Sequence, residues 1–335
     1  MLQANLKSPR QFALERVEKP KLEEGQILVK VKQTGICGSD IHAFNGKHPF
    51  ISCPIVLGHE FVGTAAEGGP ASSQLLGKRV TVLPSLVCGT CYNCRIGRFN
   101  ICENLKVIGA QAPGAFAEYV RVPEEMVFVL PSSLDWDQGV LIEPLAVAVH
   151  AVRRIARIGG QSVLVLGAGT IGLMVIAALR AYGAGQIIAV DLSENRLRLA
   201  EELGADAGLN PKGADLETWL EKEVVRIDSS FECVGLAETV NQGIKFTYKG
   251  GNVVVLGVFE ENASIEMGLV QDKELNLLGT LMYTKEDYYE AIRIMGLNPG
   301  LSRLITHRFP LRQAAQAFAV LEDQKEEALK VVLEL

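Results

Sequence analysis

The sequence has 335 residues, enough for two domains that each bury a core, and 48% of the residues are hydrophobic while 21% are charged. This composition is typical of a folded globular protein and excludes a disordered chain. A formal net charge of −6, without any block of Lys and Arg, argues against nucleic acid or an anionic membrane as a partner and favours small-molecule chemistry.

The first twelve residues, MLQANLKSPRQF, lack the apolar core of a signal peptide, so we expect a cytoplasmic protein in a reducing compartment. There, seven cysteines are expected to be metal ligands or free thiols rather than disulfides, and the odd number agrees. The uncharged stretch 158–179 is long enough to reach across a bilayer. Because glycines and a strand-like VLVLG interrupt it, we expect no membrane span.

The first half of the chain is predicted to be rich in β-strands. Residues 26–32, QILVKVK, alternate like a half-buried strand, and short strand-like runs separated by Gly and Pro continue to about Val129. We place this domain at 1–146. A helix-like segment at 285–295 and a strand-like segment at 328–335 are expected to return to it, so that 283–335 completes a discontinuous domain.

The pattern changes near Glu143, from where continuous apolar strands alternate with helices. The expected helices are 144–158, 170–183, 193–204 and 236–247, and the expected strands are 162–167, 186–191, 229–235, 251–258 and 275–281. Such alternation predicts a parallel sheet covered on both faces, so the fold class is α/β with a doubly wound Rossmann domain at 147–282.

Four cysteines lie within 15 residues of each other in a lobe at 84–105: Cys88, Cys91, Cys94 and Cys102. This spacing lets one loop wrap a tetrahedral zinc ion at S–Zn distances of about 2.3 Å. An iron–sulfur site is the alternative, but the seven-residue gap and the lack of Pro after Cys102 depart from the ferredoxin pattern. We predict a structural zinc ion. Four thiolates leave no position for a substrate, so the chemistry must lie elsewhere.

A glycine pattern follows the strand at 162–167 and opens the next helix: Gly167, Gly169, Ile171 and Gly172. There a pyrophosphate can meet helix N–H groups. Asp191 ends the next strand, where its carboxylate can accept hydrogen bonds from the adenosine ribose and would repel a 2′-phosphate, so NAD is predicted over NADP. Arg196, one helical turn on, either stacks on adenine, reaches a phosphate or is a solvated helix residue.

Three further motifs are CGSDIH at 37–42, GHEFVG at 58–63 and IEPLAVAVHA at 142–151. With the four-cysteine lobe and GAGTIG, in this order, the sequence resembles the zinc-containing medium-chain alcohol dehydrogenases, in the branch that includes sorbitol and sugar-acid dehydrogenases. The resemblance covers essentially the whole chain. It implies that the β-rich part is a GroES-like catalytic domain, that each chain holds two zinc ions and uses NAD, and that the protein is a homo-oligomer, a dimer or tetramer.

The resemblance implies a catalytic zinc ion held by Cys37, His59 and Glu60, with Glu143 either a direct ligand or reached through water. These side chains are competent zinc ligands, and one exchangeable position admits a substrate oxygen. Taken singly, each is equally a buried thiol, a core histidine or a surface acid. Asp40 lies where the family places a carboxylate that receives the other N–H of His59, although a solvated turn is the alternative.

The resemblance also assigns a proton relay, in which the substrate hydroxyl gives its proton to Ser39 and then, through ribose or water, to His42. Ser39 is alternatively a helix cap. Two segments are placed at the nicotinamide end of the cofactor: Leu256, Gly257 and Val258, and Leu281 to Tyr283. Their positions after strands give modest independent support, the alternative being ordinary sheet core.

Two positions depart from sorbitol dehydrogenases, because Ala43 stands where they have Tyr and Met282 where they have Arg. Losing those hydrogen-bond donors puts sorbitol itself in doubt. The segment CGSDIHAFNGKHPF is more similar to bacterial dehydrogenases of sugar acids, in which Lys47 or His48 would meet a carboxylate. Butanediol and threonine dehydrogenases remain candidates.

We therefore expect an enzyme that oxidises a secondary alcohol of a polyol, diol or sugar acid to the ketone by hydride transfer to NAD. Two other classes stay open. A zinc-independent quinone-reductase relative would need neither the catalytic ligand set nor the four-cysteine lobe. A zinc-stabilised nucleotide-binding protein would keep the lobe and show no turnover.

Overall fold

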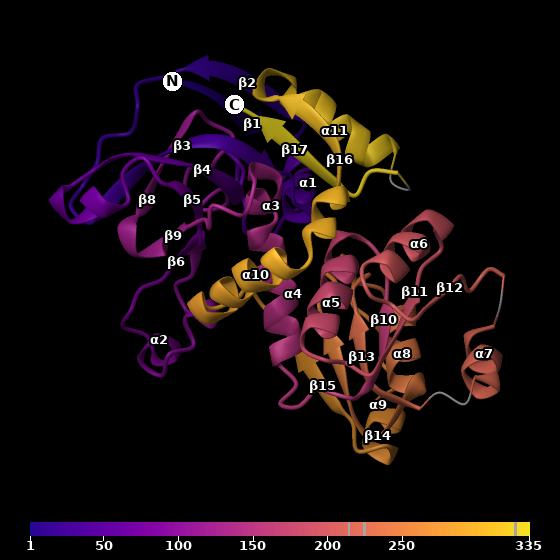
Figure 1. Ribbon diagram of the computed structural model, residues 1–335. Helices are drawn as coiled ribbons and strands as arrows, with labels where there is room; N and C mark the ends of the chain where they lie inside the picture. Colours follow the sequence, from indigo (N-terminus) through magenta and orange to yellow (C-terminus); the bar gives the residue numbers. More distant parts are fainter. Residues whose placement is uncertain (214, 224–225, 325–326) are drawn as a thin grey trace. The chain divides into compact units, whose positions relative to one another are not determined.

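The structure is a computed structural model that describes residues 1–213, 215–223, 226–324 and 327–335. The described chain divides into two compact units, Met1–Glu143 together with Thr284–Leu335, and Pro144–Tyr283. The chain leaves the first unit, builds the second and then returns (Figure 1). The boundaries expected from the sequence, at 146 and 282, lie within three residues of these crossings.

The first unit is built on a seven-stranded sheet in the order β16-β17-β3-β4-β5-β9, with β8 also paired to β3. Its strands are β3 (Gln26–Gly35), β4 (Glu60–Gly68), β5 (Arg79–Val82), β8 (Tyr119–Pro123), β9 (Val127–Val129), β16 (Ile305–Pro310) and β17 (Lys330–Glu334). Two small antiparallel sheets join β1 (Leu2–Ser8) to β2 (Gln11–Arg16) and β6 (Ser85–Leu86) to β7 (Lys106–Val107).

Strand β3 shows why the sequence folds this way. Val29 and Val31 are buried whereas Lys30 and Lys32 are exposed, so the predicted alternation is confirmed. The strand runs on to Gly35, beyond the seven residues expected. Three helices of this unit are short: α1 (Gly38–Phe44), α2 (Tyr92–Arg95) and α3 (Trp136–Val140). The two helices of the C-terminal return are longer: α10 (Lys285–Leu297) and α11 (Ala314–Asp323). Short 3-10 segments also occur in this unit: η1 (Pro70–Gln74), η2 (Phe99–Ile101), η3 (Glu124–Met126), η4 (Pro299–Leu304) and η5 (Leu311–Gln313).

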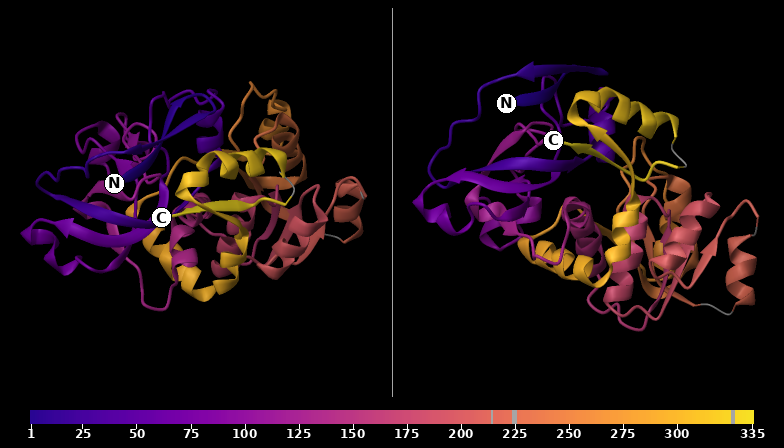
Figure 2. Two further views of the ribbon diagram at one scale, coloured as in Figure 1. Left: turned by 90° about the horizontal axis from the view of Figure 1, so that it is seen from above. Right: turned by 45° about the horizontal axis from the view of Figure 1, so that its top comes forward.

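The C-terminal return is part of the core of the first unit. Strand β17 lies between β16 and β3, and Figures 1 and 2 show the C-terminal strand beside the N-terminal segments. Phe318 on α11 packs against Phe44 and Phe12, with ring centroids 4.8 and 5.2 Å apart. Because aromatic side chains bury large apolar areas, this cluster fixes α11 over the N-terminal strands.

The second unit holds a six-stranded, wholly parallel sheet in the order β12-β11-β10-β13-β14-β15. Its strands are β10 (Ser162–Leu166), β11 (Gln186–Val190), β12 (Ala207–Leu209), β13 (Ile227–Glu232), β14 (Thr247–Val255) and β15 (Asn276–Gly279). Its helices are α4 (Ile142–Arg153), which begins at the boundary, α5 (Thr170–Ala181), α6 (Glu194–Glu202), α7 (Leu216–Lys222), α8 (Ala237–Phe246) and α9 (Met267–Asp272).

Both faces of this sheet are buried, as the continuous apolar strands predict. Leu164 and Leu166 of β10 belong to a buried cluster that includes Leu220 of α7. Val163 and Val165 point to the opposite face and are fully buried as well. The doubly wound fold is therefore confirmed.

One expected helix end was wrong. The helix predicted at 144–158 ends at Arg153, where the N–H of Ile155 already bonds the carbonyl of Val152 in a tighter turn. The chain then turns through Gly160, whose φ of 78° ends any helical path. The stretch 158–179 is thus divided between a turn, β10 and α5, and no helix in the described ranges is long and apolar enough to cross a membrane.

Candidate zinc centres and cofactor loop

The first candidate centre lies where β3 ends and β4 begins. Gly35, the last residue of β3, pairs with Glu60, the first residue of β4. Cys37 follows two residues later, and His59 immediately precedes Glu60. Ligand atoms of Cys37, His59 and Glu60 lie within 4.8 Å of one another. A thiolate, an imidazole and a carboxylate at this separation form a donor set that suits zinc.

Asp40 connects helix α1 to this centre. Cys37 occupies the N-cap position of α1, and its backbone N–H donates to Asp40 Oδ2 at 2.9 Å. The alternative that Ser39 caps this helix is wrong, because Ser39 already lies inside its first turn. The other carboxylate oxygen of Asp40, Oδ1, lies 3.7 Å from His59 Nδ1. Asp40 is fully buried, so the alternative of a solvated turn is also wrong.

The arrangement leaves His59 Nε2 as the nitrogen for a metal, because Nδ1 faces Asp40. Burial by itself lowers the pKa of His59, but the charges of Asp40 and Cys37 outweigh it and raise this pKa well above 6.5. For Asp40, an acid, burial acts in the other direction and raises the pKa, although the charge of His59 opposes this rise. The imidazole is therefore surrounded by negative charge, the environment that also favours a divalent cation.

Lys330 on β17 lies against the same centre and was not among the residues singled out from the sequence. Its Nζ is 2.7 Å from both carboxylate oxygens of Glu60, and the lysine and the glutamate are both buried. Burial alone lowers the pKa of Lys330, but Glu60 and Cys37 outweigh it and raise that pKa. The available signal was a charged residue at the start of the apolar strand KVVLE.

The other residues expected at this centre are Glu143, Ser39 and His42. Glu143, in the first turn of α4, is buried, and its charge raises the pKa of both His59 and Lys330. It is not part of the compact three-residue donor group. Ser39 and His42 are half-buried and lie three residues apart on α1, a spacing that puts two side chains on one helix face.

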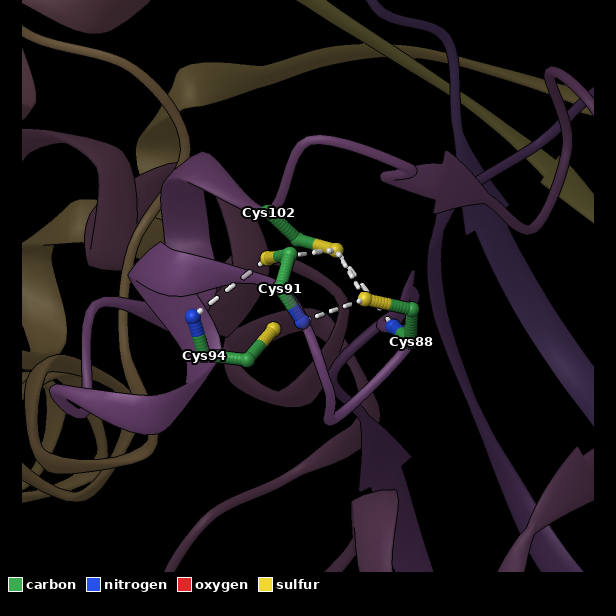
Figure 3. A group of neighbouring side chains, drawn as sticks. All are labelled: Cys88, Cys91, Cys94 and Cys102. Atoms are coloured by element: carbon green, nitrogen blue, oxygen red, sulfur yellow. Dashed lines mark hydrogen bonds between the residues drawn. The ribbon is translucent and has the colours of Figure 1, made fainter.

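The second candidate centre is the cysteine lobe, in which four thiols point toward one another (Figure 3). Cys102 Sγ lies 3.5 Å from Cys88 Sγ and 3.9 Å from Cys91 Sγ. Sulfur atoms around a tetrahedral zinc ion are roughly 3.8 Å apart for S–Zn distances near ~2.3 Å. The lobe therefore has the dimensions of a closed four-thiolate zinc site.

Backbone N–H groups support the thiolate form in this lobe. The N–H of Cys91 donates to Cys88 Sγ at 3.3 Å, and that of Cys94 donates to Cys91 Sγ at 3.4 Å. Such bonds, from Thr90 and Cys91, lower the pKa of Cys88 to about 5, whereas burial raises the pKa of Cys94 to about 12. None of the seven cysteines forms a disulfide, in agreement with the expectation.

In the second unit, the glycine loop joins β10 to α5. Gly167 has a φ of 94°, which a residue with a Cβ rarely adopts, and Gly169 is the N-cap of α5. A Cβ at Gly172 would overlap the carbonyl oxygen of Gly167, whereas a Cβ at Gly169 would meet nothing within 4 Å. These differences match the separate tasks of the glycines in a dinucleotide loop. Ile171 lies half-buried in the first turn of α5.

Asp191 immediately follows β11 and is fixed against this loop. Its Oδ2 accepts from the N–H of Ala168 at 2.7 Å and its Oδ1 from the N–H of Ser193 at 2.9 Å. The carboxylate is half-buried, so it keeps a surface for a ligand. Arg196 lies half-buried on α6. The pattern read from the sequence thus converges on one end of the sheet.

Glu232, at the end of β13, ties together two loops and was also missed from the sequence. Its Oε1 accepts from the N–H groups of Val234 and Gly235 and from the Thr239 hydroxyl, at 2.7–2.8 Å. Its backbone carbonyl accepts from the N–H groups of Leu256 and Gly257. Val258 and Leu281 are 72% and 56% exposed, so both side chains are accessible to a ligand, whereas Tyr283 is buried.

Comparisons with known proteins agree with both units. Residues 23–132 match the alcohol dehydrogenase GroES-like domain, and residues 170–296 match the zinc-binding dehydrogenase family. The chain is 30% identical to the sorbitol dehydrogenase of Bacillus subtilis strain 168, covering 99% of this chain and 97% of that protein. It is 33% identical to the L-galactonate-5-dehydrogenase of Escherichia coli K12, covering 92% of each.

Solved structures show the same similarity. An alcohol dehydrogenase from Escherichia coli CFT073, complexed with NADH, has a TM-score of 0.93 at 29% identity and covers 100% of this chain and 99% of its own. A zinc-binding dehydrogenase from Sinorhizobium meliloti 1021, bound to NADP, has a TM-score of 0.89 at 33% identity with the same coverage.

Proposed function

Because the chain belongs to the zinc-containing medium-chain alcohol dehydrogenases, we propose that it oxidises a secondary alcohol of a polyol, diol or sugar acid to the ketone with NAD. The observation that carries this proposal is the convergence of one thiolate, one imidazole and one carboxylate at the junction of β3 and β4. That donor set is open, unlike the closed four-cysteine lobe, and so leaves a position for a substrate oxygen.

In this proposal Cys37, His59 and Glu60 hold the catalytic zinc ion, and Glu143 is a direct ligand or acts through water. Zinc held there supplies Lewis-acid polarisation of the substrate hydroxyl, which lowers the pKa of that hydroxyl. Ser39 receives the hydroxyl proton and His42 passes it toward solvent. Asp40 keeps the His59 ring in one orientation, so that the imidazole presents the same nitrogen throughout turnover.

The glycine loop and Asp191 hold the dinucleotide in the second unit. The N–H groups at the start of α5 receive the pyrophosphate, and Gly169 lets the backbone approach it. Leu256, Gly257 and Val258 meet the nicotinamide end, and Arg196 meets the adenosine end. NAD bound there supplies the hydride acceptor.

The test of this function combines metal analysis with a substrate panel. We expect two zinc ions per chain and NAD reduction with at least one of a set of polyols, vicinal diols, aldonates and L-threonine. Cys37→Ala should lose one zinc ion and all turnover. Cys91→Ala should mainly lower the unfolding temperature and have little effect on the intrinsic turnover of the folded protein. A two-zinc protein that is inactive across the panel, or a fully active Cys37→Ala variant, contradicts the proposal.

The preference for NAD is proposed from Asp191, whose fixed carboxylate would face a 2′-phosphate, next to the exposed and uncharged Leu192. Since one solved relative binds NADP, the two cofactors need a direct comparison. We expect kcat/KM for NAD to exceed that for NADP at least tenfold. A tenfold preference for NADP would overturn this part of the proposal.

We further propose that the protein is a homo-oligomer. Strand β15 ends the order of the six-stranded sheet, so one of its sides has no neighbouring strand in the described part of the chain, and Leu277 on it is exposed. Such an edge is a template for pairing with a second copy. Light scattering should give a dimer or tetramer, and Leu278→Pro should shift the distribution toward monomer. A monomeric wild-type protein contradicts this proposal.

A further inference from the structure

A buried lysine shares the carboxylate of Glu60 with the candidate catalytic zinc site. Lys330 Nζ lies 2.7 Å from each carboxylate oxygen of Glu60 and 3.2 Å from the carbonyl oxygen of Ile36. Lys330 is 4% exposed and Glu60 is 1% exposed. A nearly solvent-free ion pair, reinforced by a hydrogen bond to a backbone carbonyl, fixes both side chains firmly.

The backbone around this pair is shaped to admit it. A Cβ at Gly35 would overlap Glu60 Oε2, so only glycine at the end of β3 leaves room for the carboxylate where it lies. Val332 of β17 pairs with Gly35, the last residue of β3. Lys330 precedes Val332 by two residues, so this pairing brings Lys330 to the end of β3. Residues from both ends of the first unit therefore build one charge arrangement.

The position of Glu60 places two cations in competition for one carboxylate. One Glu60 oxygen is within 4.8 Å of the Cys37 sulfur and a His59 nitrogen, which is the metal side of the centre. Both oxygens also contact the ammonium group of Lys330. A carboxylate that already neutralises an ammonium group donates less to a metal ion than an unpaired one does.

We propose that Lys330 is a positioning residue that weakens Glu60 as a zinc ligand and thereby keeps one zinc position exchangeable for the substrate. The inference rests on the ligand set of the proposed function. In this inference Lys330 acts on the metal mainly through Glu60, the one side chain of the donor set that its ammonium group contacts. An additional consequence is charge balance, because the ammonium group offsets one of the negative groups gathered around the metal.

The experiment measures zinc affinity at this site in Lys330→Met and Lys330→Arg by competition with a chelator. The same titration in Cys37→Ser measures the zinc affinity of the four-cysteine lobe alone. Subtracting it from the wild-type titration gives the zinc affinity of the catalytic site. We expect Lys330→Met to bind zinc there at least tenfold more tightly, because Glu60 is then free to ligate, and to have a lower kcat. The unfolding temperature of its zinc-free form should fall. Lys330→Arg, which keeps the charge, should stay close to wild type.

Two controls separate positioning from general stability. Lys273, in the second unit, is a partly buried lysine that donates to backbone carbonyls of Ile244 and Thr247. Lys273→Met should lower stability and leave zinc affinity unchanged. In a Glu60→Gln background, Lys330→Met should no longer tighten zinc binding, since the charge through which it acts is gone. Should Lys330→Met fold poorly without zinc, Lys330→Gln gives the same comparison.

Zinc affinity that is unchanged or weaker in both Lys330→Met and Lys330→Gln overturns the inference, as does tightening that persists in the Glu60→Gln background. Failure of the proposed function has a different signature. There, the wild-type protein itself would bind no zinc that depends on Cys37, or would oxidise no alcohol in the panel.

Discussion

At the scale of single residues, Asp40 links the start of a helix to the orientation of His59, a candidate metal ligand. It is fully buried, and it accepts from the Cys37 N–H while facing His59 Nδ1. We predict that Asp40→Asn lowers zinc affinity at the catalytic site about 10- to 100-fold, because the amide removes the charge that favours the ligating imidazole. Chelator competition measures this loss.

Helix α1 should survive that substitution, since the Asn side-chain oxygen still accepts from Cys37. Asp215 offers a matched control, because it caps α7 through the N–H of Thr218 and lies in the other unit. Asp215→Asn should leave zinc affinity unchanged. Equal zinc affinity in Asp40→Asn and wild type would refute the role assigned to Asp40.

Substrate choice is also a matter of single residues. His48 is half-buried, and burial lowers its pKa. The charges of His42 and His59 lower this pKa further, so His48 lies near the candidate catalytic centre. If the substrate is a sugar acid, Lys47 and His48 are the side chains expected to meet its carboxylate. We predict that the double substitution to Ala raises KM for the aldonate about tenfold or more. The kcat/KM for a neutral diol should stay constant, and a parallel loss for both substrates would count against this assignment.

At the scale of elements, the β10–α5 turn separates the requirements of folding from those of cofactor binding. Gly172→Ala would drive a Cβ into the Gly167 carbonyl, so we predict a lower unfolding temperature and NAD affinity reduced at least tenfold. Gly169→Ala has open space around its Cβ and should leave the unfolding temperature within about 1 °C, yet still weaken NAD binding. Thermal unfolding and NAD titration measure both effects, and an unperturbed Gly172→Ala protein would contradict the packing argument.

The same elements show how far sequence patterns reach. Helices α5 and α10 were predictable because each is long enough to repeat its apolar period, and strand β10 because it is one continuous apolar run. The strand predicted at 251–258 was only partly right, because β14 spans Thr247–Val255. Strand β12 has three residues and α7 has seven, too few for a period to stand out. The two candidate metal-binding groups were predictable because their residues lie in local motifs. Lys330 was not, because its partner Glu60 is 270 residues away in the chain and only the pairing of β17 with β3 brings them together.

At the scale of the whole molecule, the discontinuous first unit depends on contacts between its two chain segments. Tyr288 on α10 is one such contact, since its buried hydroxyl lies 2.9 Å from Thr81 Oγ1 and donates to the Val82 carbonyl at 2.8 Å. Asp137 on α3 is another, because Arg308 of β16 bonds both its carboxylate oxygens, at 2.7 and 2.8 Å. Gln33 of β3 adds a third bond to Asp137 at 3.0 Å.

The Asp137 contact makes the attachment of the C-terminal segment sensitive to acid. Burial opposes the charged carboxylate, but the hydrogen bonds from Arg308 and Gln33 outweigh it and lower the pKa of Asp137. A folded pKa below the unfolded value of about 3.9 means that the stabilisation is fully present above that value and is lost as pH falls through the folded pKa. We predict that Asp137→Asn lowers the free energy of unfolding by up to about 1 kcal/mol at pH 7, since the pair is partly exposed.

The difference between wild type and Asp137→Asn should therefore be constant from pH 7 to about pH 5 and shrink below about pH 4. Urea unfolding at a series of pH values measures it. Arg308→Gln should lower the free energy of unfolding at least as much at pH 7, because it removes the partner of Asp137 and also the 3.6 Å ion pair with Glu334. High salt should reduce the difference at pH 7, as expected for a pair with partial exposure. A difference that grows on acidification would show that another titrating group, and not Asp137, controls how the C-terminal segment is held.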